Sequence, residues 1–178
     1  MTWREMVPAG ALSLRGENRV VMFTTWWNVA LLVLSVAALP FDRRRILGLN
    51  PWVKPIKFEI SVIVFLVTMA VLLSMVGRLG ESKKARRFIG WTVGLAMIVE
   101  NTIIALQSLR GARSHMNFTS VFNGVAFGVM GVFIALNTLA VAVLLVLYLV
   151  RRPGLPSSVV WGVRLGLLVV LLGSVEGS

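Results

Sequence analysis

Five long apolar segments constrain the fold of this chain more than any other feature of the sequence. They cover approximately residues 20–39, 58–77, 88–109, 124–150 and 158–175. A helix needs about 20 mostly apolar residues to cross a hydrocarbon core of roughly 30 Å, and each segment meets or approaches that length. None of them alternates polar and apolar residues as the strands of a closed membrane barrel do. The sequence therefore predicts an all-α, polytopic transmembrane helical bundle with five spans.

The overall composition supports a membrane location. Hydrophobic residues make up 57% of the 178 residues and charged residues only 14%, whereas about a quarter of a soluble domain is charged. Ala37 and Ala38 could mimic a signal-peptide cleavage site, but the apolar run before them is longer than a typical signal-peptide core. We therefore expect residues 20–178 to form a single transmembrane domain, preceded by an N-terminal tail or interfacial helix at 1–19. The short fifth segment ends close to Ser178, which suggests a C-terminally truncated chain.

The net charge of +11 is concentrated in short basic clusters between the apolar segments. These clusters are Arg43–Arg45, Lys83–Arg87, and Arg151 with Arg152. Basic residues at the ends of spans contact anionic lipid headgroups and bias the orientation of the chain. The charge therefore predicts the lipid bilayer as a partner and argues against nucleic acid. The same bias favours a multi-pass protein of the plasma (inner) membrane with its N-terminus inside.

The scarcity of reactive side chains narrows the chemistry. The chain has no cysteine and one histidine, which excludes disulfides, thiolate metal sites and zinc sites built from several histidines of one chain. The sequence contains no phosphate-binding, dinucleotide-binding, nucleophile-elbow or zinc-protease motif. It implies no cofactor and no metal, and a membrane enzyme or a haem or quinone protein is the least supported class. A haem held by His115 would need a second axial ligand from a partner chain or from further helices.

The third apolar segment carries the only acidic residue deep inside a span. Glu100 lies near the middle of segment 88–109, where an ionised carboxylate costs about 2.5–3.5 kcal/mol on insertion scales. Gln107 is seven residues further on and shares the helix face of Glu100, and Arg110 follows one turn later. Asn101 lies about 100° round the same helix. Together these residues predict a polar stripe that runs from mid-membrane to the following connector.

Three further residues are candidate partners of this stripe. Asn137, midway along the fourth segment, is placed to meet it from a neighbouring helix, and His115 lies in the connector at its outer end. Lys57 belongs to connector 41–58, in which two prolines interrupt helix formation. This connector is either an interfacial turn with snorkelling lysines or a partly re-entrant segment that carries Lys57 into a cavity.

Two functions account for the polar stripe. In the first, the protein binds or passes a small polar solute, a cation or a proton through a cavity lined by the third and fourth spans. Glu100 would bear the charge or proton there, and Gln107 and Asn137 would coordinate the ligand. The mouth would be formed by Arg110, His115 and Lys57. In the second, Glu100 is protonated and bonded to Asn137 or Asn101, the polar residues only hold helices together, and the protein is a scaffold or assembly partner. The first is our leading hypothesis because the stripe is continuous to the surface.

Glycines four residues apart recur in three of the segments. Small residues at this spacing let helix backbones approach closely, which matters in lipid because no hydrophobic driving force remains between helices. They predict a tight bundle and offer faces for a homo-oligomer. The pairs are Gly90 with Gly94, Gly124 with Gly128, and Gly162 with Gly166.

Two stretches of the chain resemble an uncharacterised group of bacterial multi-pass membrane proteins. The first is Pro51-Trp52-Val53-Lys54-Pro55-Ile56-Lys57-Phe58. The second is Gln107-x-x-Arg110-Gly111-x-x-Ser114-His115-Met116-Asn117, in which Met116 stands where Phe is expected. The resemblance implies a helical bacterial membrane protein and implies no activity. Members of the group are longer than this chain, which agrees with a truncated sequence.

Overall fold

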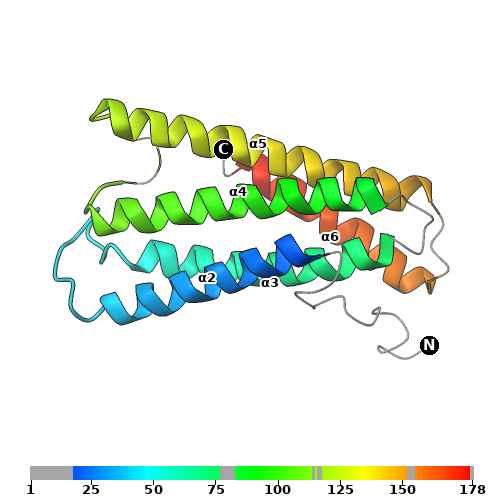
Figure 1. Ribbon diagram of the computed structural model, residues 1–178, viewed down its shortest axis with the longest axis horizontal. Helices are drawn as coiled ribbons and strands as arrows, with labels where there is room; N and C mark the ends of the chain where they lie inside the picture. Colours follow the sequence, from blue (N-terminus) through cyan, green and yellow to red (C-terminus); the bar gives the residue numbers. More distant parts are fainter. Residues whose placement is uncertain (1–17, 77–82, 114, 116–117, 152–154, 177–178) are drawn as a thin grey trace.

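The computed structural model describes residues 18–76, 83–113, 115, 118–151 and 155–176 (Figure 1). In this part of the chain, five α-helices follow one another, and their labels are those of Figure 1. They are α2 (Arg19–Ala38), α3 (Val53–Val76), α4 (Lys83–Leu109), α5 (Val121–Val150) and α6 (Ser157–Glu176). Each helix is long and apolar enough to cross a membrane. The prediction of an all-α bundle with five spans is therefore confirmed.

Two helices begin earlier than their apolar segments predict. α3 starts at Val53, not near residue 58, because Pro55 falls in the first turn, where its missing N–H would have no helical partner in any case. α4 starts at Lys83, not near residue 88, because Lys, Arg and Ala are good helix formers and long basic side chains can reach the headgroup region. The predicted N-terminal tail or interfacial helix lies outside the described residues apart from its last two.

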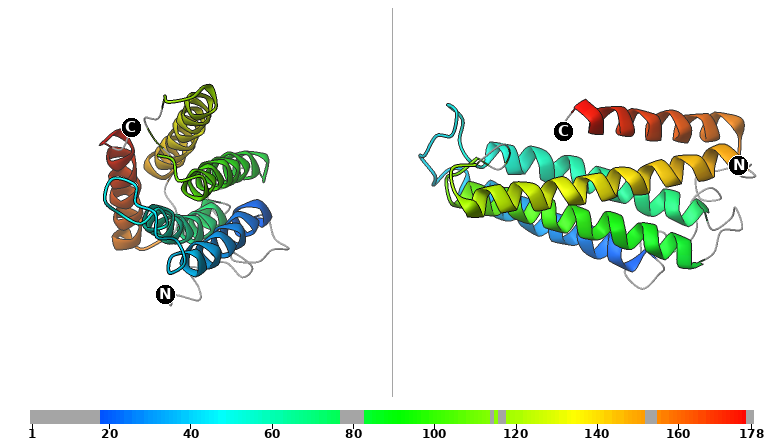
Figure 2. Two further views of the ribbon diagram at one scale, coloured as in Figure 1. Left: turned by 90° about the vertical axis from the view of Figure 1, so that its left-hand side faces the viewer. Right: turned by 90° about the horizontal axis from the view of Figure 1, so that it is seen from above.

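Helices α2, α3 and α4 pack against one another in pairs and form the centre of the bundle. α5 packs on α4, and α6 packs on α5, as the end-on view in Figure 2 shows. α5 is also tied to α3, because the buried Tyr148 hydroxyl donates a hydrogen bond to the Leu72 carbonyl at 3.1 Å. Arg164 of α6 in turn donates from Nε to the Tyr148 carbonyl at 2.9 Å. Specific hydrogen bonds thus join α5 to the central helices and α6 to α5.

One of the three glycine pairs explains the close approach of α2 and α4. A Cβ atom on Gly94 would lie 2.8 Å from Val20 Cγ1 and 3.1 Å from Thr24 Oγ1. A Cβ on Gly90 would contact both Val21 of α2 and Leu73 of α3. The other two pairs behave differently, because the Cβ positions of their glycines meet either nothing or only a distant phenylalanine carbon.

The connector 39–52 and the connector 110–120 lie at the same end of the bundle (Figure 1), which we call the cavity end. α2 and α4 run toward this end, and α3 and α5 run away from it. Fully buried apolar side chains of α2, α3 and α4 fill the half of the bundle that is further from the cavity end. They include Val21, Leu66, Leu73, Val76 and Val93.

Candidate functional site

The connector 39–52 is held in place by one carboxylate. Asp42 accepts hydrogen bonds from Arg44 Nη2 at 2.6 Å and from the indole Nε1 of Trp52 at 3.0 Å. The hydrogen bonds from Arg44 hold the pKa of the Asp42 carboxyl well below its ordinary value. Arg44 also donates from Nη1 to the Leu109 carbonyl at 3.1 Å, so the connector is fastened to the last turn of α4.

The tip of this connector is a two-residue hairpin turn. Ile46 and Leu49 exchange backbone hydrogen bonds of 2.8 and 3.1 Å, and the two central residues have positive φ, 53° at Leu47 and 82° at Gly48. Positive φ at both positions is the conformation of a type I′ turn. The non-helical backbone ends before Val53, and Lys54, Pro55 and Lys57 belong to helix α3. The interfacial-turn and re-entrant interpretations of this connector both stay predictions.

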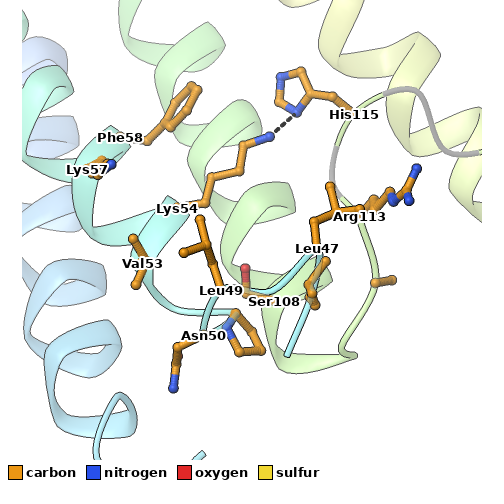
Figure 3. Close-up of a pocket in the computed structure, with 13 residues that line it drawn as sticks. Leu47, Leu49, Asn50, Val53, Lys54, Lys57, Phe58, Ser108, Arg113 and His115 are labelled. Carbon is orange, nitrogen blue, oxygen red and sulfur yellow. Dashed lines mark hydrogen bonds between the residues drawn. The ribbon is translucent and has the colours of Figure 1, made fainter. Parts of the chain in front are cut away.

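A cavity of about 350 Å³ lies between this connector, the first turns of α3 and the end of α4 (Figure 3). Its basic side chains are Lys54, Lys57, Arg113 and the imidazole of His115, and none of the lining residues that the structure describes is acidic. Its apolar walls come mainly from the hairpin turn and from the start of α3. They include Ile46, Leu47, Leu49, Pro51, Val53 and Phe58. The cavity is therefore both positively charged and apolar.

Lys54 and His115 meet inside this cavity. Lys54 Nζ lies 3.0 Å from His115 Nδ1 (Figure 3) and 5.5 Å from the centre of the Phe58 ring. Burial, and secondarily the Lys54 ammonium, lowers the pKa of His115 to about 4. The imidazole is therefore neutral at pH 7, and because an ammonium can only donate, Nδ1 accepts the hydrogen bond. The His115 ring is also held between Phe58 and Phe127, at centroid distances of 6.1 and 6.3 Å.

The outer part of the predicted stripe forms a bonded cluster between α4 and α5. The fully buried Gln107 donates from Nε2 to Asn123 Oδ1 at 3.0 Å. Arg110 donates from Nη1 to Gln107 Oε1 at 2.9 Å and to Asn123 Oδ1 at 3.1 Å. Asn123 in turn donates to Thr119 Oγ1 at 3.0 Å. The structure thus brings Gln107 and Arg110 together, and their common partner is Asn123, which the sequence analysis missed.

The inner part of the stripe is arranged differently. Glu100 is buried and is attracted electrostatically by Lys54 of α3. Asn101 is 1% exposed, and neither its Oδ1 nor its Nδ2 has a hydrogen-bond partner among the described residues. Asn137 of α5 is buried, and its Oδ1 likewise has none. The structure therefore does not join Glu100 to either asparagine by a hydrogen bond in the described part of the chain.

The three residues predicted to form the mouth of the cavity do not lie at one site. His115 lines the cavity, and so does Lys57, whose side chain is otherwise exposed. Arg110 instead belongs to the bonded cluster. The lysine in contact with His115 is Lys54, which was not a candidate. The cavity lies beside the ends of α3 and α4 and is lined by their connectors, whereas we expected a cavity between the third and fourth spans.

A second group that the sequence analysis missed lies between α2, α3 and α4. Glu59 has no exposed surface; its Oε1 accepts a 2.9 Å hydrogen bond from Ser35 of α2, and its Oε2 has no partner among the described residues. Asn28, also without exposed surface, has an unpartnered Oδ1. The seven-residue spacing from Asn28 to Ser35 was the available signal, because residues seven apart share a helix face. With Asn101 and Ser108 of α4, these residues form what we call the buried seam.

In the part of the chain that the structure describes, metal-ligating residues do not gather. Among the described residues, no three His, Asp or Glu side chains come close enough together to hold a metal ion. Comparisons with protein-family models, with curated proteins and with solved structures found no match for the chain. The resemblance to a bacterial membrane group therefore stays a prediction. The five candidate spans indicate a multi-pass membrane protein. A more specific function has to be inferred from the charge, burial and contacts of the cavity and its neighbours.

Proposed function

We propose that the protein binds a small amphipathic solute through its anionic group, a carboxylate or a phosphate, in the cavity at the cavity end of the bundle. The observation that carries the proposal is the position of Lys54: its ammonium contacts a neutral imidazole and an aromatic ring in a cavity that has no acidic residue among its described lining residues. The Lys54 side chain is exposed and its ammonium is therefore accessible, and a hydrogen bond from a charged donor to an anionic acceptor is stronger than one to a neutral imidazole. The apolar walls would receive the rest of the solute.

The sign of the charge distinguishes this solute from the alternatives. A cation in the cavity would meet Lys54, Lys57 and Arg113, which repel it. The attraction between Lys54 and Glu100 supplies only one carboxylate, and that carboxylate does not line the cavity. Of the polar solute, cation and proton in our hypothesis, the cavity therefore favours a polar solute with a negative charge.

Calorimetry with matched ligands tests the proposal. We would titrate purified protein in a non-ionic detergent with octanoate, octyl phosphate and octyltrimethylammonium, and subtract titrations into empty micelles. We expect the two anions to bind and the cation not to bind. Lys54→Gln should weaken anion binding about tenfold or more, since a hydrogen bond to a charged group contributes roughly 1.5–3 kcal/mol.

The control for this substitution is Lys84→Gln. Lys84 is an exposed lysine in the first turn of α4, at the opposite end of the bundle from the cavity. It removes the same charge without touching the cavity, so it should leave the affinity unchanged. Equal binding of the cation, or equal loss of affinity in Lys54→Gln and Lys84→Gln, would contradict the proposal.

A second candidate function is membrane assembly, and a different observation favours it. Cβ atoms placed on Gly128 and Gly131 of α5, or on Gly162 and Gly166 of α6, would meet no atom within 4 Å. These small residues therefore lie on open helix faces, which suit association with another helix in lipid. Light scattering of Gly128→Leu and Gly166→Leu in detergent tests this, with the wild type expected to be oligomeric and the variants monomeric. A monomeric wild type at all concentrations would count against assembly.

A further inference from the structure

The buried seam is a set of buried polar side chains on three helices that pack against one another. Its members are Asn28 and Ser35 of α2, Glu59 of α3, and Asn101 and Ser108 of α4, none more than 5% exposed. Two hydrogen bonds between helices fix their relative heights. Thr24 Oγ1 donates to the Gly94 carbonyl at 3.3 Å, and Ser35 bonds Glu59. Asn101 and Ser108 lie seven and fourteen residues beyond Gly94, so they share the face that meets α2.

Four polar atoms of the seam lack a partner in the described part of the chain. They are Asn28 Oδ1, Glu59 Oε2, and Oδ1 and Nδ2 of Asn101. Buried polar groups in native proteins are almost always hydrogen-bonded, and each unsatisfied group costs about 1–3 kcal/mol. Oxygens and nitrogens of this kind are the partners that buried waters take.

The length of the seam favours a file of waters over a single metal ion. Asn28 is seven residues from Ser35, the partner of Glu59, which corresponds to about 10 Å along a helix. A metal ion holds its oxygen ligands at roughly 2.0–2.6 Å from one centre, so one ion cannot serve both ends. Waters spaced about 2.8 Å apart can span the distance.

The seam is open at one end and closed at the other. Ser108 lines the cavity, so the seam reaches the cavity end of the bundle. Beyond Asn28, the same three helices are filled by Val21, Leu66 and Leu73, each at most 1% exposed. A Cβ on Gly90 would be in van der Waals contact with both Val21 and Leu73, so α4 lies against both other helices in this half.

We propose that the buried seam is a one-ended water path from the cavity into the membrane interior, and that Glu59 is a proton-binding site on this path. A proton on the Glu59 carboxyl passes to a neighbouring water and is replaced from the file, which keeps the count of protons balanced. The other ionisable residues at this depth are Glu100 of α4 and, nearer the cavity, Lys54 and Lys57 of α3; α2 contributes none. The water path does not require an anion in the cavity, so its test is independent of the test of the proposed function.

Cysteine accessibility tests the path, and the absence of native cysteine makes every introduced thiol unambiguous. We would place single cysteines along the seam and in the packed half, expose the protein in liposomes to Ag⁺ from either side, and then label unreacted thiols with a maleimide in SDS. Ag⁺ is small enough to follow a file of waters. The seam variants are Ser108→Cys, Asn101→Cys and Asn28→Cys, and the controls are Leu66→Cys and Leu73→Cys.

The proposal predicts that Ag⁺ abolishes later labelling of the three seam cysteines from the cavity side only, and that the two leucine positions keep full labelling. Protection of Asn101→Cys and Asn28→Cys equal to that of Leu66→Cys would overturn it, because the seam would then be dry. Reaction of Leu66→Cys and Leu73→Cys as fast as the seam cysteines would also overturn it, because the path would not be one-ended. Monodisperse gel filtration shows that each variant is folded.

A second measurement uses the native protein, which has no introduced cysteine, so it does not depend on the folding of the cysteine variants. Infrared difference spectra in H₂O and D₂O report protonated carboxyls and their exchange with solvent. We expect a carboxyl band that shifts on transfer to D₂O and is lost in Glu59→Gln but kept in Glu100→Gln. A Glu59 band that does not shift in D₂O would contradict a hydrated path.

Discussion

Helix α4 carries buried polar side chains on two faces, and the two groups differ in whether their hydrogen bonds are made. Gln107 faces α5, and every bond in its cluster with Asn123 and Arg110 is between protein groups. Asn101 faces α2, about 120° round the helix, and both of its side-chain polar atoms lack a partner in the described residues. Both faces carry a buried side-chain amide, but the hydrogen bonds of Gln107 are made by protein groups and those of Asn101 are not.

This difference distinguishes a polar cluster that joins two helices from a polar group that needs water beside it. A cluster in which protein groups satisfy one another joins two helices and needs nothing from outside. A group with unpartnered buried atoms is stable only if another polar species occupies the space beside it. The polar stripe of the sequence analysis contained members of both groups, so we interpret its inner and outer parts separately. The predictions below test whether the two faces really differ.

The largest effect is expected where α2 and α4 are closest. In Gly94→Leu, the new side chain would collide with Val20 and Thr24, because even a Cβ lies 2.8 Å from Val20 Cγ1. Overpacking of this kind costs about 1–3 kcal/mol and sometimes more, and the seam between the helices would be distorted. The measurement is the free energy of unfolding in mixed micelles.

Gly173→Leu is the matched control for this substitution. It places the same side chain on a glycine of α6 whose Cβ would meet nothing within 4 Å, so the free energy of unfolding should change little. Equal destabilisation by Gly94→Leu and Gly173→Leu would show that α2 and α4 are not in close contact at Gly94.

The next effect concerns the bonded face. Asn123→Leu removes the acceptor of two hydrogen bonds, from Gln107 and from Arg110, and leaves the buried Gln107 amide without its partner. We expect a loss of about 1–3 kcal/mol in the free energy of unfolding. Asn137→Leu on the same helix, whose Oδ1 has no partner among the described residues, should change stability by no more than about 0.5 kcal/mol. Equal losses in the two variants would remove the distinction between bonded and unpartnered groups.

The sequence was sufficient for the helices but not for their exact starts. Length and hydropathy fix the number of spans because only helices satisfy the backbone within such apolar runs. The start of α3 depends on whether Pro55 ends the connector or enters the first turn, and the pattern allows both. The start of α3 determines where the next polar residues lie. With a start at Val53, Glu59 lies nearly two turns inside the helix, and Lys54 is the lysine that contacts His115.

The hydrogen-bond partners of the polar residues could not be predicted from the sequence for a different reason. Gln107 and Arg110 could be paired because positions three apart on one helix are neighbours. Asn123 and Ser35 belong to other helices, and their contacts depend on how those helices pack. The seven-residue repeat of Asn28 with Ser35, and of Asn101 with Ser108, was visible. Nothing in one helix alone shows that the two repeats face each other.

A smaller effect is expected from the titration of His115. Its pKa is lowered from 6.5 to about 4, so between these values the unfolded chain binds more protons than the folded one. Stability is then full above about pH 6.5 and falls as the pH drops toward 4. Because the chain has one histidine, an NMR titration of ¹³C-labelled imidazole gives its pKa without assignment.

Lys54→Met tests the electrostatic part of this shift. The substitution removes the ammonium and keeps an unbranched side chain of similar length, so the pKa of His115 should rise but stay below 6.5, because burial is the larger cause. His115→Gln should remove the part of this pH dependence that His115 contributes, so the stability curve of the variant should be flatter in this window. A wild-type midpoint near 6.5 would mean that the imidazole is solvated and that the contact with Lys54 is not formed in solution.

The smallest effect on stability, and the most informative one, is expected from Asn101→Leu. No protein bond is lost, because neither polar atom of Asn101 has a partner in the described residues, and an apolar side chain of similar size fills the same space. The free energy of unfolding should therefore stay within about 0.5 kcal/mol of the wild type or rise. If the seam holds water, the same substitution interrupts the file, so Ag⁺ should no longer reach a cysteine at Asn28 while it still reaches one at Ser108. Destabilisation as large as that of Asn123→Leu would instead make the seam a second adhesive face, and the two sides of α4 would no longer differ.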